Sequence, residues 1–174
     1  MRLIASVLAL ACLTAPLQAD EIADALTAAQ TAYSANDLKG AAAQVALAQA
    51  GLRAKQNALL EAFLPEAPEG FTREIVADFA AGFGMFGGGA GAEARYTNAE
   101  GSFTIDLIAD NEMVVSMLGI FADATTMAMM GNVIKVGEFS ILDQEQNLTA
   151  LVGTRIMVSA TGMDSKLMLP AVQV

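Results

Sequence analysis

The spacing of apolar residues along this chain changes at the segment 65–70, Pro-Glu-Ala-Pro-Glu-Gly. Residues 20–64, before this segment, contain no proline and are rich in alanine, leucine, glutamine and glutamate, which favour helices. After it, apolar and polar residues alternate, as in strands with one buried face. Because proline ends the hydrogen-bond ladder of a helix, the sequence predicts a helical part at 20–64 and a sheet-forming part at 65–174.

The helical part is interpreted as a hairpin of two helices. The break at residues 34–37, Ser-Ala-Asn-Asp, supplies capping residues for the second helix. Apolar residues then follow at spacings of one helical face: Leu38, Ala41, Ala42, Val45, Leu52, Leu59 and Phe63. Residues 32–41, together with Ala48, resemble one tetratricopeptide unit. Because no second copy occurs at the expected period, a plain helical hairpin is the favoured interpretation.

Alternation is clearest in residues 103–109, where every second residue is apolar. Residues 95–97 join this strand through residues 98–101, which predicts a β-hairpin. Residues 113–130 contain a single charge, Asp123, and predict a helix buried on most sides. Gly131 is expected to close that helix as a left-handed cap.

The remaining segments predict further strands and a short helix. Residues 133–142 are interpreted as one strand with a bulge at Gly137, where the apolar positions change phase. Residues 148–152 and 155–160 form one strand or two, with a break at Gly153. Asp164 is expected to cap a last helix that reaches Leu169. The sequence therefore predicts an α+β fold, an N-terminal helical hairpin followed by an antiparallel sheet with helices packed on it.

Three stretches carry a resemblance to a known family. They are residues 64–71 (Leu-Pro-Glu-Ala-Pro-Glu-Gly-Phe), residues 95–97 with their hairpin, and residues 151–158 (Leu-Val-Gly-Thr-Arg-Ile-Met-Val). Over about residues 64–170 the layout resembles small exported bacterial proteins of the PsbP-like fold. The resemblance implies a layer fold and a non-catalytic accessory or assembly role, and it implies no site residues.

The N-terminus has the pattern of a cleavable signal peptide. Arg2 gives a positive start, residues 3–13 an apolar run, and residues 16–19 an exit of small residues before Asp20. We expect cleavage after Ala19 and a periplasmic or secreted protein, with an alanine-rich composition typical of bacteria. The apolar stretch 113–130 is interrupted at 123–126, so no membrane span is expected after cleavage.

Charge and residue content exclude several classes of function. The formal net charge is −10, and removal of Arg2 with the signal peptide makes it −11, so nucleic-acid binding is not expected. The sequence contains no histidine, and its single cysteine, Cys12, lies in the signal peptide. The commonest general base and metal ligands are therefore missing. We expect a non-enzymatic protein with no cofactor and no metal.

Two sets of side chains leave alternatives open. Asp106, Asp110 and Glu112 form the densest acidic group and are interpreted as solvated surface. A carboxylate-dependent hydrolase would need Asp106 or Glu112 to face another acid across a cleft. The methionines suit Cu(I), although we interpret them as core residues. They are Met85, Met113, Met117, Met127, Met129, Met130, Met157, Met163 and Met168.

The stretch 79–92 is the most unusual, with three phenylalanines, six glycines and no charge. Its phenylalanines either pack into the core or form an apolar flap that contacts a partner. The candidate interaction residues are Phe79, Phe83, Met85, Phe86, Gly87, Gly88 and Gly89. Through them we expect a binding or accessory module whose partner is another envelope protein or an apolar small molecule. A small-ligand or lipid carrier is the alternative and would need an enclosed apolar cavity beneath residues 79–92.

Overall fold

The fold is that of a computed structural model, which describes residues 20–85 and 88–172. It is α+β, with two N-terminal helices followed by a seven-stranded antiparallel sheet and further helices. The chain forms two compact units, Met1–Gln49 and Ala50–Val174, and the division between them lies inside the second helix.

The first unit contains α1 (Glu21–Ser34) and the first half of α2 (Leu38–Glu61). Asp20 caps α1, because its carboxylate accepts a hydrogen bond from the amide of Ile22 at 3.2 Å. Asp37 likewise accepts one from the amide of Gly40 at 2.9 Å. The buried residues of this unit are alanines, whose small side chains let helices approach closely: Ala25, Ala29, Ala41 and Ala48. The predicted helical hairpin is confirmed.

Most of the apolar positions assigned to one face, including Leu38, Val45 and Leu59, are exposed. In the second unit the end of α2 instead buries Leu60, and Leu64 is buried just after it. The domain boundary at 65–70 stays a prediction, although these two leucines belong to the core that covers the sheet.

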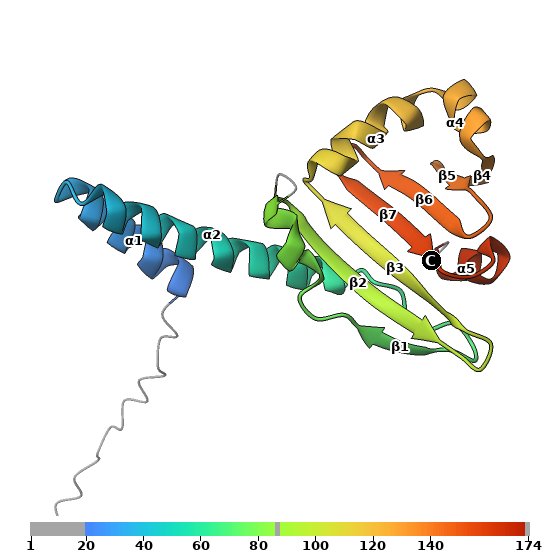
Figure 1. The fold of residues 1–174 in the computed structure, drawn as a ribbon, viewed down its shortest axis with the longest axis horizontal. Helices are drawn as coiled ribbons and strands as arrows, with labels where there is room; N and C mark the ends of the chain where they lie inside the picture. The colour runs from blue at the N-terminus through green and yellow to red at the C-terminus, as the bar shows by residue number, and fades with distance from the viewer. Residues whose placement is uncertain (1–19, 86–87, 173–174) are drawn as a thin grey trace, which may run out of the picture. The chain divides into compact units, whose positions relative to one another are not determined.

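The sheet of the second unit has the order β1-β2-β3-β7-β6-β5-β4, and all neighbouring strands are antiparallel (Figure 1). The strands are β1 (Thr72–Ile75), β2 (Ala90–Thr97), β3 (Ser102–Ala109), β4 (Asn132–Val136), β5 (Phe139–Asp143), β6 (Asn147–Val152) and β7 (Ile156–Thr161). Short turns join β2 to β3, β4 to β5, β5 to β6 and β6 to β7, which favours antiparallel pairing.

The sheet is accompanied by a 3-10 helix and three α-helices. They are η1 (Phe79–Met85), α3 (Glu112–Ala122), α4 (Ala124–Met130) and α5 (Ser165–Val172). Helix α3 begins past the end of β3 and α5 past the end of β7, at opposite ends of the sheet (Figure 1). Asp164 caps α5, as expected, through a 2.9 Å hydrogen bond from the amide of Lys166 to its carboxylate.

The first face of the sheet carries the larger core. Alternate residues of β2, β3, β7, β6 and β5 point to it, and Leu60, Leu64, Met168 and Ala171 cover it. Its buried strand residues are Ala90, Ala92, Ala94, Tyr96, Phe103, Ile105, Leu107, Ala109, Ile141, Leu148, Ala150 and Ala160. The predicted alternation in residues 103–109 is therefore confirmed.

The second face carries a smaller core. It consists of Ile108, Val114, Leu151 and Met157, with partly buried side chains from η1 and α3 packed against them. The central row of this face runs across five strand pairs from polar to apolar residues: Glu93, Asp106, Ser159, Thr149, Leu142 and Val133. Ser159 and Thr149 are buried although they are polar.

The expectation for residues 113–130 is wrong in one respect. Asp123 ends α3 and caps α4, and only Val114 and Met127 of the two helices are buried. Large apolar residues such as Val115 and Met129 are exposed. Composition predicted burial on most sides, but each helix has only one side against the rest of the protein. No single helix among the described residues meets the length and hydropathy of a membrane span, and α3 and α4 meet them only jointly, with a 105° bend.

Three further local expectations are corrected. Gly131 has φ 174°, which is extended backbone and not a left-handed cap. Gly137 is no bulge, because Val136 pairs with Phe139 and the two residues between them form a hairpin turn. Gly137 has φ 56°, which suits the first central position of such a turn. Strand β2 begins at Ala90, five residues before the expected start.

Candidate functional site

An apolar cavity of about 430 Å³ lies on the first face of the sheet, within the second unit. We call it the hairpin groove, because the turn between β4 and β5 forms one of its sides. Its lining residues are Phe63, Pro65, Ile105, Leu107, Val136, Gly137, Glu138, Phe139, Ile141, Ala150, Val152, Val158, Ala171 and Val172. All of them are apolar or glycine except Glu138.

Two of the residues that line the groove, Ala150 and Ala171, have small side chains. Ala150 stands in one row of the sheet between Val158 and Ile141, which are larger. Ala171 of α5 is likewise a small residue among the groove's lining. Larger residues at either position would extend into the space that now forms the cavity. Both alanines are buried, and a larger side chain at either would reduce the volume of the groove.

The rim of the groove carries exposed aromatic rings. Phe63, just after α2, is 76% exposed, and Phe139, at the start of β5, is 44% exposed. The wall next to Phe63 is anchored by Tyr96, which is fully buried and donates a 2.6 Å hydrogen bond from its hydroxyl to the Pro65 carbonyl. Burial raises the pKa of this hydroxyl, so it stays a donor over the physiological range. Tyr96 also stacks on Phe103, with ring centroids 4.8 Å apart.

The glycine and phenylalanine segment lies on the opposite face. Phe79 and Phe83 of η1 are partly buried against the smaller core and meet edge to face, with centroids 5.3 Å apart. Gly91 lies beneath them, because a Cβ at this position would be 2.5 Å from the Phe83 ring. The packing agrees with the interpretation of these phenylalanines as core residues, and a partner-binding role for the segment stays a prediction.

The structure describes only some of the other candidate residues of this segment. Phe86, Gly87 and the side chain of Met85 lie outside the described part of the chain. Gly88 and Gly89 lead into β2 with φ of 87° and 105°, and the carbonyl of Gly88 accepts a hydrogen bond from the side-chain amide of Asn111. This bond ties the segment to the residue that caps α3.

A small cavity lies beside residues 79–92, but it is not the enclosed apolar cavity that the carrier alternative requires. Its volume is about 190 Å³, and its lining includes Asp78, Phe79, Gly91 and residues of α2, among them Glu61. Asn57 of α2 accepts a 3.1 Å hydrogen bond from the amide of Gly91 at this place. This cavity is smaller and more polar than the hairpin groove, so the groove is the better candidate for an apolar ligand.

Asp106 and Glu93 form a pair of carboxyl groups on the second face. They are directly opposite each other on β3 and β2 and share a side-chain hydrogen bond, which requires a proton on one of them. Burial, the charge of Glu93 and this hydrogen bond raise the pKa of Asp106 to about 7. The second oxygen, Oδ1 of Asp106, is buried and has no hydrogen-bond partner among the described residues.

This pair bears on the hydrolase alternative. Asp106 faces an acid of the neighbouring strand, and neither carboxyl group lines the two cavities described above. Asp110 lies beyond the end of β3 and accepts two hydrogen bonds from Arg155, of 2.6 and 2.7 Å, which lower its pKa. Glu112 is an exposed residue at the start of α3. The three acids are therefore in different environments and form no common site.

The methionines are spread over both faces of the sheet. Met168 belongs to the larger core, Met157 and Met117 to the smaller one, and Met129 is 84% exposed. Within residues 20–85 and 88–172, no group of three or more His, Cys, Asp or Glu side chains is arranged to hold a metal ion. The Cu(I) alternative gains no support from this arrangement.

Sequence reasoning missed Glu93 and the groove. The predicted strand begins at residue 95 and leaves Glu93 outside it, although counting back through the four-residue turn at 98–101 places Glu93 opposite Asp106. The groove had no comparable signal, because Phe63 and Phe139 are far apart in the sequence. Comparison of the chain with protein-family models, curated proteins and solved structures gives no match.

Proposed function

We propose that the protein is an exported, non-enzymatic binding module that holds the apolar part of a small ligand in the hairpin groove. The observation that carries this proposal is the cavity of about 430 Å³ with thirteen apolar or glycine residues among its fourteen lining residues. Small-molecule sites typically have volumes of about 300 to 1,000 Å³ and mostly apolar walls with few polar groups. The groove has both properties.

The exposed rings at the rim support the same proposal. Phe63, Phe139 and Val152 all line the groove and all remain partly in water. Contiguous exposed apolar surface is typical of binding sites, because its contact with water is unfavourable until a ligand covers it. An apolar ligand that lies on Ala150 would contact the floor of the groove and these three side chains together.

The other parts of the proposal rest on the sequence. The signal-peptide pattern of residues 1–19 supports export to the periplasm or beyond the cell. The lack of histidine supports a role in binding and not in catalysis. The resemblance to PsbP-like proteins, which we retain as a proposal, supports an accessory role.

A neutral fluorescent probe tests the groove directly. The chain from Asp20 onward is titrated with N-phenyl-1-naphthylamine, whose emission rises in apolar surroundings. We expect one saturable site, and Ala150→Leu, which fills the floor, should weaken binding at least about tenfold. Ala128→Leu makes the same change at an exposed position of α4 and should leave binding unchanged.

A second variant covers the case in which Ala150→Leu does not fold. Phe63 is mostly exposed, so Phe63→Ala should leave the core intact and still weaken probe binding. Circular dichroism checks the fold of each variant. A probe that does not bind, or that binds Ala150→Leu and Phe63→Ala as tightly as the original chain, would refute the proposal.

A further inference from the structure

The hairpin groove has a single charged lining residue, Glu138. This residue is exposed and occupies the second position of the turn between β4 and β5. Its side chain forms no hydrogen bond or ion pair with any residue that the structure describes. The carboxylate is therefore available to a ligand that enters beside it.

Cationic side chains near the groove are directed elsewhere. Lys135 precedes the turn, but alternation along β4 places it on the opposite face, where its ammonium group donates a 2.6 Å hydrogen bond to the Ser140 hydroxyl. Arg73 lies near the Pro65 wall and is paired with Glu66 at 3.0 Å. The charge that a ligand meets at the groove is thus that of Glu138.

The net charge of the whole chain is negative, as is the charge of Glu138. Its formal net charge of −10 gives the surface a potential that attracts cations and repels anions. An alkyl carboxylate or sulfate in the groove would place its head beside Glu138 against this field. An alkyl cation would be attracted by the charge of Glu138 and by the net negative charge of the chain.

The aromatic rings at the rim favour the same kind of head group. Phe63 and Phe139 line the groove, and both expose part of their rings to solvent. The negative face of an aromatic ring attracts ammonium groups, and quaternary ammonium ions are recognised in this way. Glu138 and Phe139 are adjacent in the chain, so a cation near one is close to the other.

We infer that the groove selects small amphiphiles with one alkyl chain and a cationic head, whose chain lies on the sheet at Ala150 and whose head lies at Glu138. This inference rests on the proposed function, because it requires an apolar ligand in the groove. It adds the charge of the ligand and the residue that recognises it.

Displacement of the naphthylamine probe tests the charge preference. The competitors are dodecyltrimethylammonium, dodecanol and dodecanoate, which share their chain length and are used below their critical micelle concentrations at low salt. We expect the cation to displace the probe at a concentration about tenfold below that of dodecanoate, with dodecanol between them. A preference for dodecanoate, or equal displacement by cation and anion, would overturn the inference.

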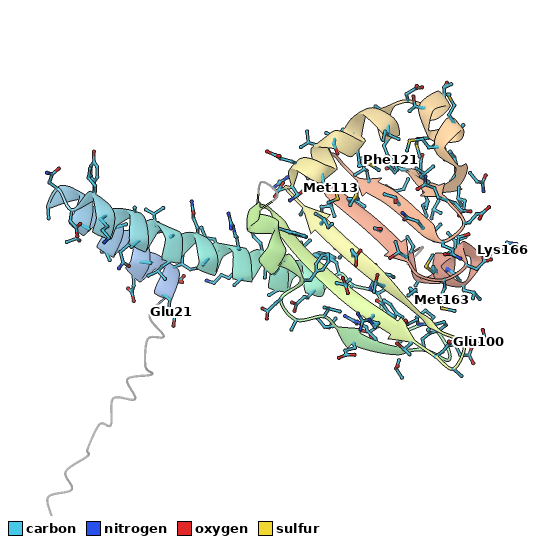
Figure 2. The ribbon with its side chains drawn as sticks, viewed as in Figure 1. Glu21, Glu100, Met113, Phe121, Met163 and Lys166 are labelled. Atoms are coloured by element: carbon cyan, nitrogen blue, oxygen red, sulfur yellow. The ribbon has the colours of Figure 1, made fainter. Side chains whose placement is uncertain are left out.

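Variants of Glu138 assign the preference to this residue. Glu138→Gln should reduce the difference between the concentrations at which dodecyltrimethylammonium and dodecanoate displace the probe. Glu138→Lys should make dodecanoate the stronger competitor. Glu100→Lys makes the same charge change at the tip of the hairpin between β2 and β3 (Figure 2) and should leave the order as it was. If Glu138→Lys retains the preference of the original chain, Glu138 is not the recognition residue and the inference fails.

The two levels of the proposal fail in different ways. If the probe does not bind, or if Ala150→Leu and Phe63→Ala bind it unchanged, the proposed function itself is refuted. If the probe binds and both variants weaken it, but the three competitors act alike, the proposed function stands and only the charge selection is refuted. A lysine-containing apolar peptide that displaces the probe while dodecyltrimethylammonium does not would also overturn the inference.

Discussion

Replacing Asp106 by asparagine removes a carboxyl group that the folded protein holds protonated until its pKa of about 7. The unfolded chain ionises this group near its ordinary pKa of 3.8. The folded state therefore binds more protons between these two values, and the contribution of Asp106 to stability falls as pH rises from about 4 to about 7. Above that range the folded protein bears the full loss of stability that ionisation of Asp106 causes.

The difference between the two pKa values, about 7 and 3.8, corresponds to at most about 4 kcal/mol. Because Asp106 is only partly buried, solvent screening reduces this, and we expect a cost of about 2 kcal/mol at pH 8. Asparagine carries no charge and can donate a hydrogen bond to the Glu93 carboxylate. Asp106→Asn should therefore increase the free energy of unfolding by about 2 kcal/mol at pH 8 and change it little at pH 4.

Urea denaturation at pH 4, 6 and 8 measures this directly. Glu100→Gln, which neutralises an exposed carboxylate in the same β-hairpin (Figure 2), is the matched control and should show no comparable gain. Glu93→Gln should lower the pKa of Asp106 by removing its charged neighbour. A loss of stability of Asp106→Asn at pH 8, or an equal change at pH 4 and pH 8, would show that the two carboxyl groups do not share a proton as described.

Three more predictions concern packing and processing. Tyr96→Phe removes the buried hydrogen bond to the loop after α2 and should lower the free energy of unfolding by about 1 kcal/mol in urea denaturation, with faster proteolysis of that loop. Gly91→Ala places a Cβ against the Phe83 ring and should cost about 1 to 3 kcal/mol in the same assay, whereas Gly82→Ala, with open space around it, should be close to neutral. N-terminal sequencing of the protein isolated from its native host should show cleavage after Ala19; an intact N-terminus would exclude a cleaved signal peptide.

Much of the fold could be predicted because its signals are local. The strand at 102–109, its four-residue turn and the cap at Asp164 all follow from neighbouring residues. The two N-terminal helices follow from composition and the break at residues 34–37. In each case the residues that determine the element lie within it or next to it.

The first half of β2 was missed because its sequence has little intrinsic preference for a strand. Residues 90–94 are Ala-Gly-Ala-Glu-Ala, without a β-branched or aromatic residue. They form a strand because β3 pairs with them along their whole length, and because small side chains fit beneath the residues that cover the larger core. Because Glu93 lies in this part of β2, its position opposite Asp106 was missed as well.

The groove and the exposure of α3 and α4 could not be predicted, because both depend on contacts between distant segments. Hydropathy indicated that residues 113–130 are buried, but it does not say how much of a helix the rest of the chain covers. The groove combines Phe63, the turn at Gly137 and the end of α5, which no local pattern connects. Its size depends on volumes that only the assembled sheet defines.

The pairing of β2 with β3 makes the turn at 98–101 intolerant of changes in length. Side chains of a strand alternate between its two faces, so one added residue that shifted the pairing would exchange the faces of the whole of β2. Tyr96 would then point to the polar face, and Glu93 would enter the larger core without a partner. Homologues of this protein should therefore keep four residues in this turn, whatever the length of their other loops.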